Sequence, residues 1–305
     1  MQSLSAAIDL GTNTARLLIG YMDDARRITP VIYLRKITRL GGGFTKERGI
    51  STEASKRTVS ALCDFAAEIK RHNAVRVRAV ATSAVRDAAN GKEFCDMILK
   101  ESGIKLEVID GETEGILTLR GVLAEIDESC ENFMVFDVGG GSTEYTLARS
   151  DKLLFTESLP LGVVRLTEGK TTCAAMEDKI SRELLVIREK LANKGYLPFL
   201  ENAVLVGTAG TATTLAAISL KMTDYDYRLV NNYVVGLDEI KEIFSILLPM
   251  KPEQRLTIPG LEKGREDLII AGTLITIKTM EYFGFSRLKV SDFGLLEGVL
   301  LSVRN

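Results

Sequence analysis

Apolar residues along the chain follow two alternating patterns, short strand-like runs and longer runs with helical spacing. In the first third, strand patterns at 5–10, 15–22, 75–82 and 105–110 are separated by helical patterns at 52–72 and 92–103. Gly103 ends the second helical pattern, as glycine commonly does. Strands that alternate with helices in this way predict an α/β fold in which crossover helices pack on a sheet.

The rest of the chain repeats this pattern. Strand patterns lie at 133–138, 144–149 and 287–292, and helical patterns at 176–195, 238–248 and 266–283. The stretch 203–218 has the pattern of a strand, a glycine turn and a helix, and the chain ends with a terminal helix. No low-complexity linker separates the two halves. Two domains of ordinary size are therefore expected within the 305 residues.

One glycine-rich stretch in each half lies between two strand patterns. AIDLGTNTARLLI (7–19) aligns without gaps on VFDVGGGSTEYTL (135–147), which starts 128 residues later. The alignment places Asp9 on Asp137 and Gly11 on Gly139. A spacing this long does not suit a solenoid repeat, so the match favours two related domains that each open with strand, glycine-rich turn and strand.

The chemistry of these turns points to phosphate and a hard cation. Glycines allow successive backbone N–H groups to face one point and form an anion-binding nest. Both turns lie between strands, unlike the Rossmann fingerprint and the P-loop, which each open a helix. Asp137 and Glu144 flank the second turn, and Mg²⁺ is commonly bound through one or two carboxylates together with substrate phosphates. A tight hairpin with solvated acids is the alternative.

Composition limits the remaining choices. The formal net charge of -2 excludes a globally basic surface of the kind that binds nucleic acid. With His72 as the single histidine, a Ser-His-Asp triad and a two-histidine metal site are excluded, and His72 itself suits a helix C-terminus. The four scattered cysteines favour reduced, mostly buried thiols, and the N-terminus lacks a signal peptide pattern. We expect a cytoplasmic protein without membrane contact.

Further motifs, together with the two turns, resemble the Ppx/GppA phosphatase family over nearly the whole chain. Each motif alone is weak evidence for the family, but the order of the motifs along the chain is specific to it. They are Arg39-Leu40-Gly41, ATSAVRDAAN (81–90), GETEG (111–115), GTAGT (207–211), the run from Pro259 to Gly272, and SDFGLLEG (291–298).

The resemblance implies a fold of two ribonuclease-H-like domains of the actin-like ATPase superfamily, with an active-site cleft between them. We expect the N-terminal domain at 1–123, with a C-terminal helix at 295–305 packing on it, and the C-terminal domain at 124–294. Members of the family are exopolyphosphatases or guanosine pentaphosphate (pppGpp) phosphohydrolases.

Residues matching the family motifs receive expected roles. Glu114 is the expected catalytic base, with Glu112 as the alternative acid, and Asp137 and Glu144 are expected to bind Mg²⁺ or another divalent cation. Arg86 matches the family arginine that contacts substrate phosphate. The expected phosphate-binding residues are Asp9, Thr12, Asn13, Thr14, Arg16, Arg86, Gly139, Gly140, Gly141, Ser142, Gly207, Gly210 and Thr211.

The expected activity is hydrolysis of the terminal phosphate of inorganic polyphosphate, with pppGpp as the alternative substrate. An actin-like or sugar-kinase-like ATP-binding protein is a more distant alternative, and a homodimer is left open. A polyphosphate tail needs a positive track, for which Arg16, Lys36, Arg39 and Arg165 are candidates because they lie near the turns in sequence.

Overall fold

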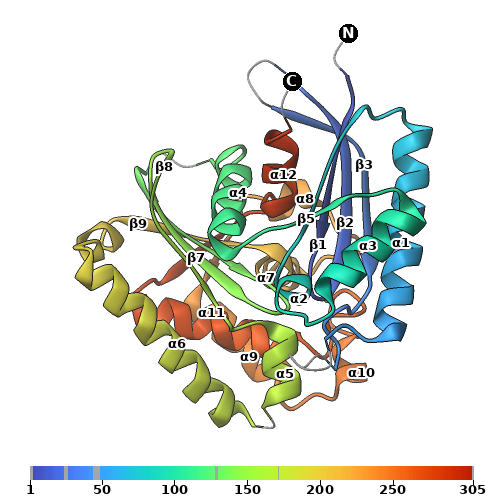
Figure 1. Cartoon of the computed structure of the whole chain (residues 1–305). Helices are drawn as coiled ribbons and strands as arrows, with labels where there is room; N and C mark the ends of the chain where they lie inside the picture. The colour runs from blue at the N-terminus through green and yellow to red at the C-terminus, as the bar shows by residue number, and fades with distance from the viewer. Residues whose placement is uncertain (1–2, 24–26, 44–48, 128–129, 171, 304–305) are drawn as a thin grey trace. The chain divides into compact units, whose positions relative to one another are not determined.

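The computed structural model describes residues 3–23, 27–43, 49–127, 130–170 and 172–303 (Figure 1). Contacts between Cα atoms divide the chain into two compact units. Unit 1 comprises Met1–Ala124 and Gly294–Asn305, and unit 2 comprises Glu125–Phe293. No helix within the described ranges is both long and apolar enough to cross a membrane.

Unit 1 is built on a five-stranded mixed sheet with strand order β3-β2-β1-β4-β5. The first three strands form an antiparallel meander, while β4 and β5 run parallel to β1. The strands are β1 (Ser5–Leu10), β2 (Thr14–Met22), β3 (Ile28–Ile37), β4 (Arg76–Ala81) and β5 (Leu106–Val108). The helices are α1 (Thr52–Arg71), α2 (Ser83–Arg86), α3 (Gly91–Ser102), α4 (Gly111–Leu123) and α12 (Leu295–Leu301).

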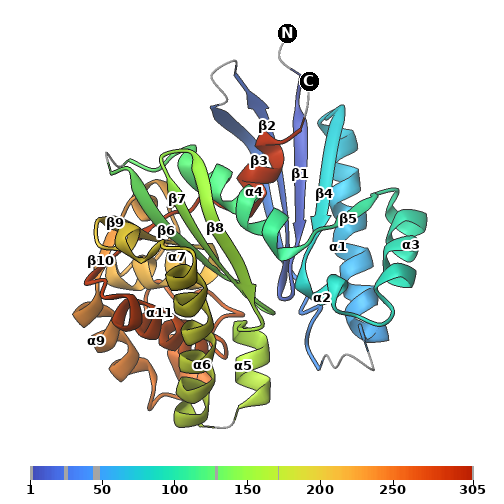
Figure 2. The same cartoon turned by 60° about the vertical axis from the view of Figure 1, so that its left-hand side comes forward.

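Helices cover both faces of this sheet, as Figure 2 shows. Alternate residues of β1 point to opposite faces. Ile8 faces a core that includes Leu62 of α1 and Phe94 of α3. Ala7 faces the other core, which includes Leu117 of α4 and Leu296 of α12. The C-terminal helix thus completes the core of unit 1.

Unit 2 has a six-stranded mixed sheet with strand order β10-β11-β9-β6-β7-β8. Its strands are β6 (Asn132–Val138), β7 (Thr143–Arg149), β8 (Lys152–Leu159), β9 (Ala203–Thr208), β10 (Val234–Gly236) and β11 (Arg287–Val290). Its helices are α5 (Val163–Gly169), α6 (Cys173–Asn193), η1 (Leu197–Leu200), α7 (Ala209–Ser219), α8 (Tyr227–Val230), α9 (Leu237–Leu247), α10 (Pro252–Arg255) and α11 (Ile269–Phe283). Phe136 of β6 shares one large core with Ile180 of α6, Leu215 of α7 and Leu274 of α11.

Five strands of each sheet share one topology, an antiparallel meander followed by two strands parallel to its first strand, and unit 2 adds β10 at the edge, antiparallel to β11. The predicted α/β class with two ribonuclease-H-like folds is therefore confirmed. The sequence patterns missed β3 and β8, the third strand of each meander. In β3 the apolar alternation is obscured because Val31 and Tyr33 are 42% and 52% exposed on an edge strand.

Two smaller predictions can also be compared with the structure. His72 is the C-cap of α1, as predicted for a group that suits a helix C-terminus. The four cysteines are free, as predicted, but all four are partly exposed, so the expectation of mostly buried thiols was wrong. The spacing of cysteines in the sequence indicates whether they form disulfides or metal sites, whereas the burial of their thiols depends on tertiary packing.

Candidate active site

Three of the predicted motifs meet at one edge of the sheet in unit 1. The parallel strands β1 and β4 end side by side, with Leu10 paired with Ala81. The N–H of Thr82 donates to the carbonyl oxygen of Leu10 (3.2 Å), and the N–H of Ile109 donates to that of Ala81 (3.0 Å). The first glycine turn, the ATSAVR segment and the GETEG segment therefore leave the sheet at its carboxyl edge.

Residues 11–13, predicted to bind phosphate and called the first phosphate loop below, form a tight turn between β1 and β2. The N–H of Gly11 donates to the carbonyl oxygen of Thr14 (2.9 Å) and closes the turn. Thr12 is buried, and its hydroxyl oxygen lies 3.1 Å from that of Ser83 in α2. The side-chain oxygen of Asn13 is buried and has no hydrogen-bond partner among the described residues.

A following segment, residues 38–41, covers the carbonyl side of this loop and is called the strap below. The N–H groups of Thr38 and Arg39 donate to the carbonyl oxygen of Asn13 (3.0 and 2.9 Å), and that of Gly41 donates to Thr12 (2.9 Å). Within the described ranges, the N–H groups of Thr12 and Asn13 have no such acceptor. The loop therefore presents donors rather than acceptors, as an anion nest requires.

Asp9 and Arg16 lie directly opposite each other on β1 and β2. The Nε of Arg16 donates to Oδ2 of Asp9 (2.9 Å), while Oδ1 is buried without a hydrogen-bond partner in the described part of the chain. Burial acts to lower the pKa of Arg16, but the Asp9 carboxylate, with further contributions from Tyr33 and Glu297, holds that pKa well above its usual value. Two predicted site residues thus form an ion pair beside the first loop.

Arg86 and Glu114 form a second ion pair at the same edge. Arg86 ends α2, and its Nη1 lies 3.2 Å from Oε2 of Glu114 and donates to the carbonyl oxygen of Ile109 (3.1 Å). Glu114 is only 6% exposed, whereas Glu112 is exposed to solvent. The structure therefore brings Glu114, and not the alternative acid, into contact with the predicted phosphate-binding arginine.

The helix α4, which carries Glu114, is held near both of its ends. Asp110 caps the helix by accepting the N–H of Thr113 (2.8 Å), and this hydrogen bond lowers the pKa of the Asp110 carboxyl below its usual value. Farther along, a Cβ atom at Gly121 would lie 1.9 Å from the carbonyl oxygen of Gly294 at the start of α12. The C-terminal helix thus supports the helix of the candidate base.

In unit 2, residues 139–142, predicted to bind phosphate and called the second phosphate loop below, have the same construction. The N–H of Gly139 donates to the carbonyl oxygen of Ser142 (3.0 Å), as Gly11 does to Thr14. The first N–H groups of α5 cover its carbonyls, with Val163 donating to Gly139 (3.0 Å) and Val164 to Gly140 (2.9 Å). In each unit, the backbone N–H groups of a separate segment therefore donate hydrogen bonds to the carbonyl oxygens of the glycine turn.

Gly162 is the N-cap of α5, and we expect Gly162→Ala to disrupt the second loop. A Cβ atom there would lie 2.3 Å from the carbonyl oxygen of Gly140 and 2.4 Å from the carbonyl carbon of Gly141, and backbone atoms of a tight turn cannot easily move away. Overpacking of this kind costs roughly 1–3 kcal/mol of unfolding free energy, which urea denaturation would measure. Gly169→Ala in the same helix is the control, because a Cβ there would meet no described atom within 4 Å beyond its own helix and chain neighbours. Equal stability of the two variants would contradict this interpretation.

The two carboxylates expected to bind a metal ion lie on one face of the unit 2 sheet. Asp137 and Glu144 are directly paired on β6 and β7, and are 7% and 2% exposed. Ser158 of β8 donates to Oε1 of Glu144 (2.7 Å). The described residues contain no cluster of three or more histidine, cysteine or acidic side chains that could hold a metal ion. Two carboxylates that leave coordination positions to water and phosphate fit Mg²⁺, which rarely has an all-protein cage.

The GTAGT segment forms the turn from β9 to α7 at the same edge, because Thr208 pairs with Asp137. Gly207 is packed against the side chains of Phe136 and Leu288, which leave little space for a Cβ atom. The Nη1 of Arg265 occupies the space that a Cβ of Gly210 would take. Thr211 is buried against Gly272. The predicted run from Pro259 to Gly272 therefore supports this turn.

The four candidates for a positive track have different surroundings. Arg16 is paired with Asp9, and Lys36 lies 3.3 Å from Asp64 of α1. Arg39 belongs to the strap of the first loop, and the N–H of Arg165 lies 3.4 Å from the carbonyl oxygen of Gly140 in the second loop. Arg39 and Arg165 thus flank the loops through their backbones.

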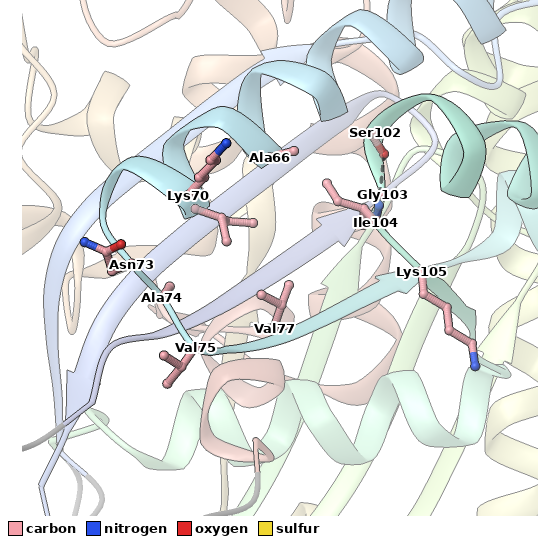
Figure 3. A pocket seen from close by; sticks show the side chains of 11 residues that line it. Ala66, Lys70, Asn73, Ala74, Val75, Val77, Ser102, Gly103, Ile104 and Lys105 are labelled. Atoms are coloured by element: carbon pink, nitrogen blue, oxygen red, sulfur yellow. Dashed lines mark hydrogen bonds between the residues drawn. The ribbon is translucent and has the colours of Figure 1, made fainter.

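A pocket of about 540 Å³ lies at the opposite end of the unit 1 sheet, near the start of β4 (Figure 3). Ile69, Val77 and Ile104 form part of its apolar lining. The ammonium groups of Lys70 and Lys105 do not point toward one another (Figure 3). Because it lies at the start of β4, whereas the predicted motifs meet at the ends of β1 and β4, the pocket has no part in the candidate active site.

Several residues around the two loops were missed by the sequence patterns. Arg57 bonds to the strap, Ser158 bonds to Glu144, and Gly162 lies against the backbone of the second loop, each from a segment that is distant in sequence or outside the motifs. No local pattern marks an arginine that bonds to a backbone carbonyl 19 residues away. Such contacts can be found only once the fold brings the segments together.

Comparisons with known proteins give a consistent result. The model of the Ppx/GppA phosphatase family matches residues 20–305. The chain is 34% identical to exopolyphosphatase 2 of Mycobacterium tuberculosis, over 98% of both proteins. It is 33% identical to the bifunctional 3-dehydroquinate synthase/phosphatase of Fusobacterium nucleatum, over 98% of this chain and 46% of that protein.

Solved structures agree with the sequence relatives. An exopolyphosphatase from Cytophaga hutchinsonii superposes with a TM-score of 0.88 at 26% identity, covering 98% of this chain and 96% of that one. The Ppx/GppA family member of Aquifex aeolicus superposes with a TM-score of 0.78 at 31% identity, covering 98% and 97%. Each comparison covers both units of the chain.

Proposed function

Because the chain belongs to the Ppx/GppA phosphatase family, whose members hydrolyse phosphoanhydrides, we propose that it removes the terminal phosphate of inorganic polyphosphate. Support comes from the carboxyl edge of unit 1. A backbone turn with outward N–H groups, a buried carboxylate and an arginine lie there at the ends of adjacent strands. These are the groups that hydrolysis of a phosphoanhydride needs.

Glu114 is the proposed general base that orients and deprotonates the attacking water. Its burial and its ion pair with Arg86 hold the carboxylate in one orientation. A base fixed in this way avoids part of the entropic cost of placing water in line with the leaving oxygen. Arg86 would bind the phosphoryl oxygens mainly through Nη2, because Nη1 contacts Glu114 and Nε lies 3.6 Å from Oδ1 of Asp87. A guanidinium offers planar donors that suit phosphate.

The two loops are the proposed phosphate-binding elements. The proposed phosphate-binding residues at the loop of unit 1 are Asp9, Thr12, Asn13, Thr14 and Arg16. In unit 2, backbone N–H groups and hydroxyls would donate to phosphate oxygens. The proposed residues there are Gly139, Gly140, Gly141, Ser142, Gly207, Gly210 and Thr211.

Asp137 and Glu144 are the proposed ligands of a divalent cation, with Mg²⁺ as the expected ion. When bound, such an ion would neutralise charge on the phosphate oxygens. Ser158 would hold Glu144 in place through its hydroxyl. The buried position of both carboxylates supports this role, since two neighbouring buried carboxylates suit a bound cation.

The substrate is tested by measuring phosphate release from long-chain polyphosphate, tripolyphosphate, pppGpp and ATP, with and without Mg²⁺. We expect rapid release from polyphosphate that depends on the divalent cation. A preference for pppGpp would support the alternative, guanosine pentaphosphate phosphohydrolase. Hydrolysis of ATP alone, or of none of the four, would refute both readings.

A further inference from the structure

The first phosphate loop depends on the strap, and the strap has little structure of its own. Residues 38–41 lie outside helices and strands, and Arg39 has a positive φ angle of 45°. A positive φ is unfavourable for a residue with a Cβ atom, so Arg39 needs support from its surroundings. The buried side chain of Leu40 and a turn closed by the N–H of Gly42 on the carbonyl oxygen of Arg39 (3.1 Å) hold part of the strap, and a side chain that bonds to the carbonyl oxygen of Thr38 would add a further anchor.

Arg57 of α1 provides such an anchor. Its Nε donates to the carbonyl oxygen of Thr38 (3.0 Å), and its Nη2 donates to that of Arg39 (3.4 Å). These are the two residues whose N–H groups donate to Asn13. A single guanidinium thus bonds to both residues that carry the strap's contacts to Asn13, which the rigid fork of arginine allows.

The helix that carries Arg57 is itself well fixed. α1 has 20 residues, begins at the N-cap Ser51, whose hydroxyl accepts the N–H of Ala54 (3.2 Å), and buries Leu62 and Phe65 in the core. No acidic side chain in the described ranges forms an ion pair with Arg57. Two of its three guanidinium nitrogens, Nε and Nη2, donate to the two carbonyls, and the residue itself is exposed.

We infer that Arg57 is a positioning residue for the first phosphate loop and acts on it through the strap. This inference rests on the proposed function for its kinetic consequence, but its structural part can be tested without any activity. Removing the guanidinium would loosen the strap, expose the carbonyls of Thr12 and Asn13, and disturb the N–H groups that face the phosphate.

Hydrogen exchange tests the structural part. In Arg57→Met, the amide protons of Thr38, Arg39 and Gly41 should exchange roughly tenfold faster, as expected for the loss of hydrogen bonds from a charged donor. Amide protons within β1 and β4 should keep their rates. Lys56→Met is the control, because it removes one positive charge from the neighbouring exposed position. Unchanged exchange of the strap in Arg57→Met would overturn the inference, even if the protein hydrolyses none of the substrates.

Steady-state kinetics with polyphosphate tests the expected effect of Arg57 on substrate binding. We expect Arg57→Met to raise KM roughly three- to tenfold, the effect of weakening one or two polar contacts, while kcat changes less than about twofold. Arg57→Lys should lie between Arg57→Met and the unmodified protein, because an ammonium group can reach one carbonyl but cannot bridge two. If Lys56→Met raised KM as much as Arg57→Met, loss of charge rather than of anchoring would explain the effect, and the inference would be wrong.

Discussion

Glu114→Gln is expected to reduce kcat by about 10²- to 10⁴-fold, the usual contribution of a positioned general base. The amide keeps an oxygen that can accept from Arg86 at the present 3.2 Å, so the local structure should survive. Binding of polyphosphate should therefore change little, since the lost group acts on water rather than on the phosphate. Steady-state and single-turnover rates, together with equilibrium binding, would separate the two effects.

Glu112→Gln is the matched control, because it makes the same chemical change two residues away on the exposed side of α4. It should retain nearly full turnover. If Glu112→Gln lost activity and Glu114→Gln kept it, the base would be the alternative acid. Near-normal turnover of both variants would show that neither acid of α4 is the general base.

Asp137→Asn is expected to raise the Mg²⁺ concentration needed for half-maximal activity. Loss of a direct carboxylate ligand should cost at least the roughly 10- to 100-fold that removal of an outer ligand partner commonly costs. Titration of activity with Mg²⁺ measures this shift, and metal binding followed by calorimetry measures it without turnover. Excess chelator should abolish activity of the unmodified protein.

Asp151→Asn serves as the control, since it lies in the exposed turn between β7 and β8. Ser158→Ala should give an intermediate shift, because it removes the hydroxyl that donates to Glu144 (2.7 Å) but leaves both carboxylates. An unchanged Mg²⁺ requirement in Asp137→Asn and in Glu144→Gln would show that these acids do not bind the cation.

The sequence predicted most of the elements that have a strong local pattern. The helix predicted at 52–72 is observed as Thr52–Arg71, and the one predicted to stop at Gly103 ends at Ser102. Edge strands were harder to find. β3 contains Pro30 and exposes several apolar side chains, so that its alternation does not separate a buried face from a solvent face.

The correspondence between the two loops was also visible in the sequence. The alignment of Asp9 with Asp137 predicted related hairpins, and both turns close by a glycine N–H bonded to the carbonyl three residues later. This hydrogen bond joins residues that are near each other in the chain. Local spacing and glycine content are therefore enough to indicate it.

What the sequence by itself determined is the order of the elements, the two glycine turns and the acids and arginine that suit phosphate chemistry. Only the tertiary structure decided that Glu114 is buried against Arg86 while Glu112 is exposed, and that the strap and α5 cover the loop carbonyls. The physical reason is that turn formation depends on neighbouring residues. Burial and ion pairing depend on segments that come together only when the sheet forms.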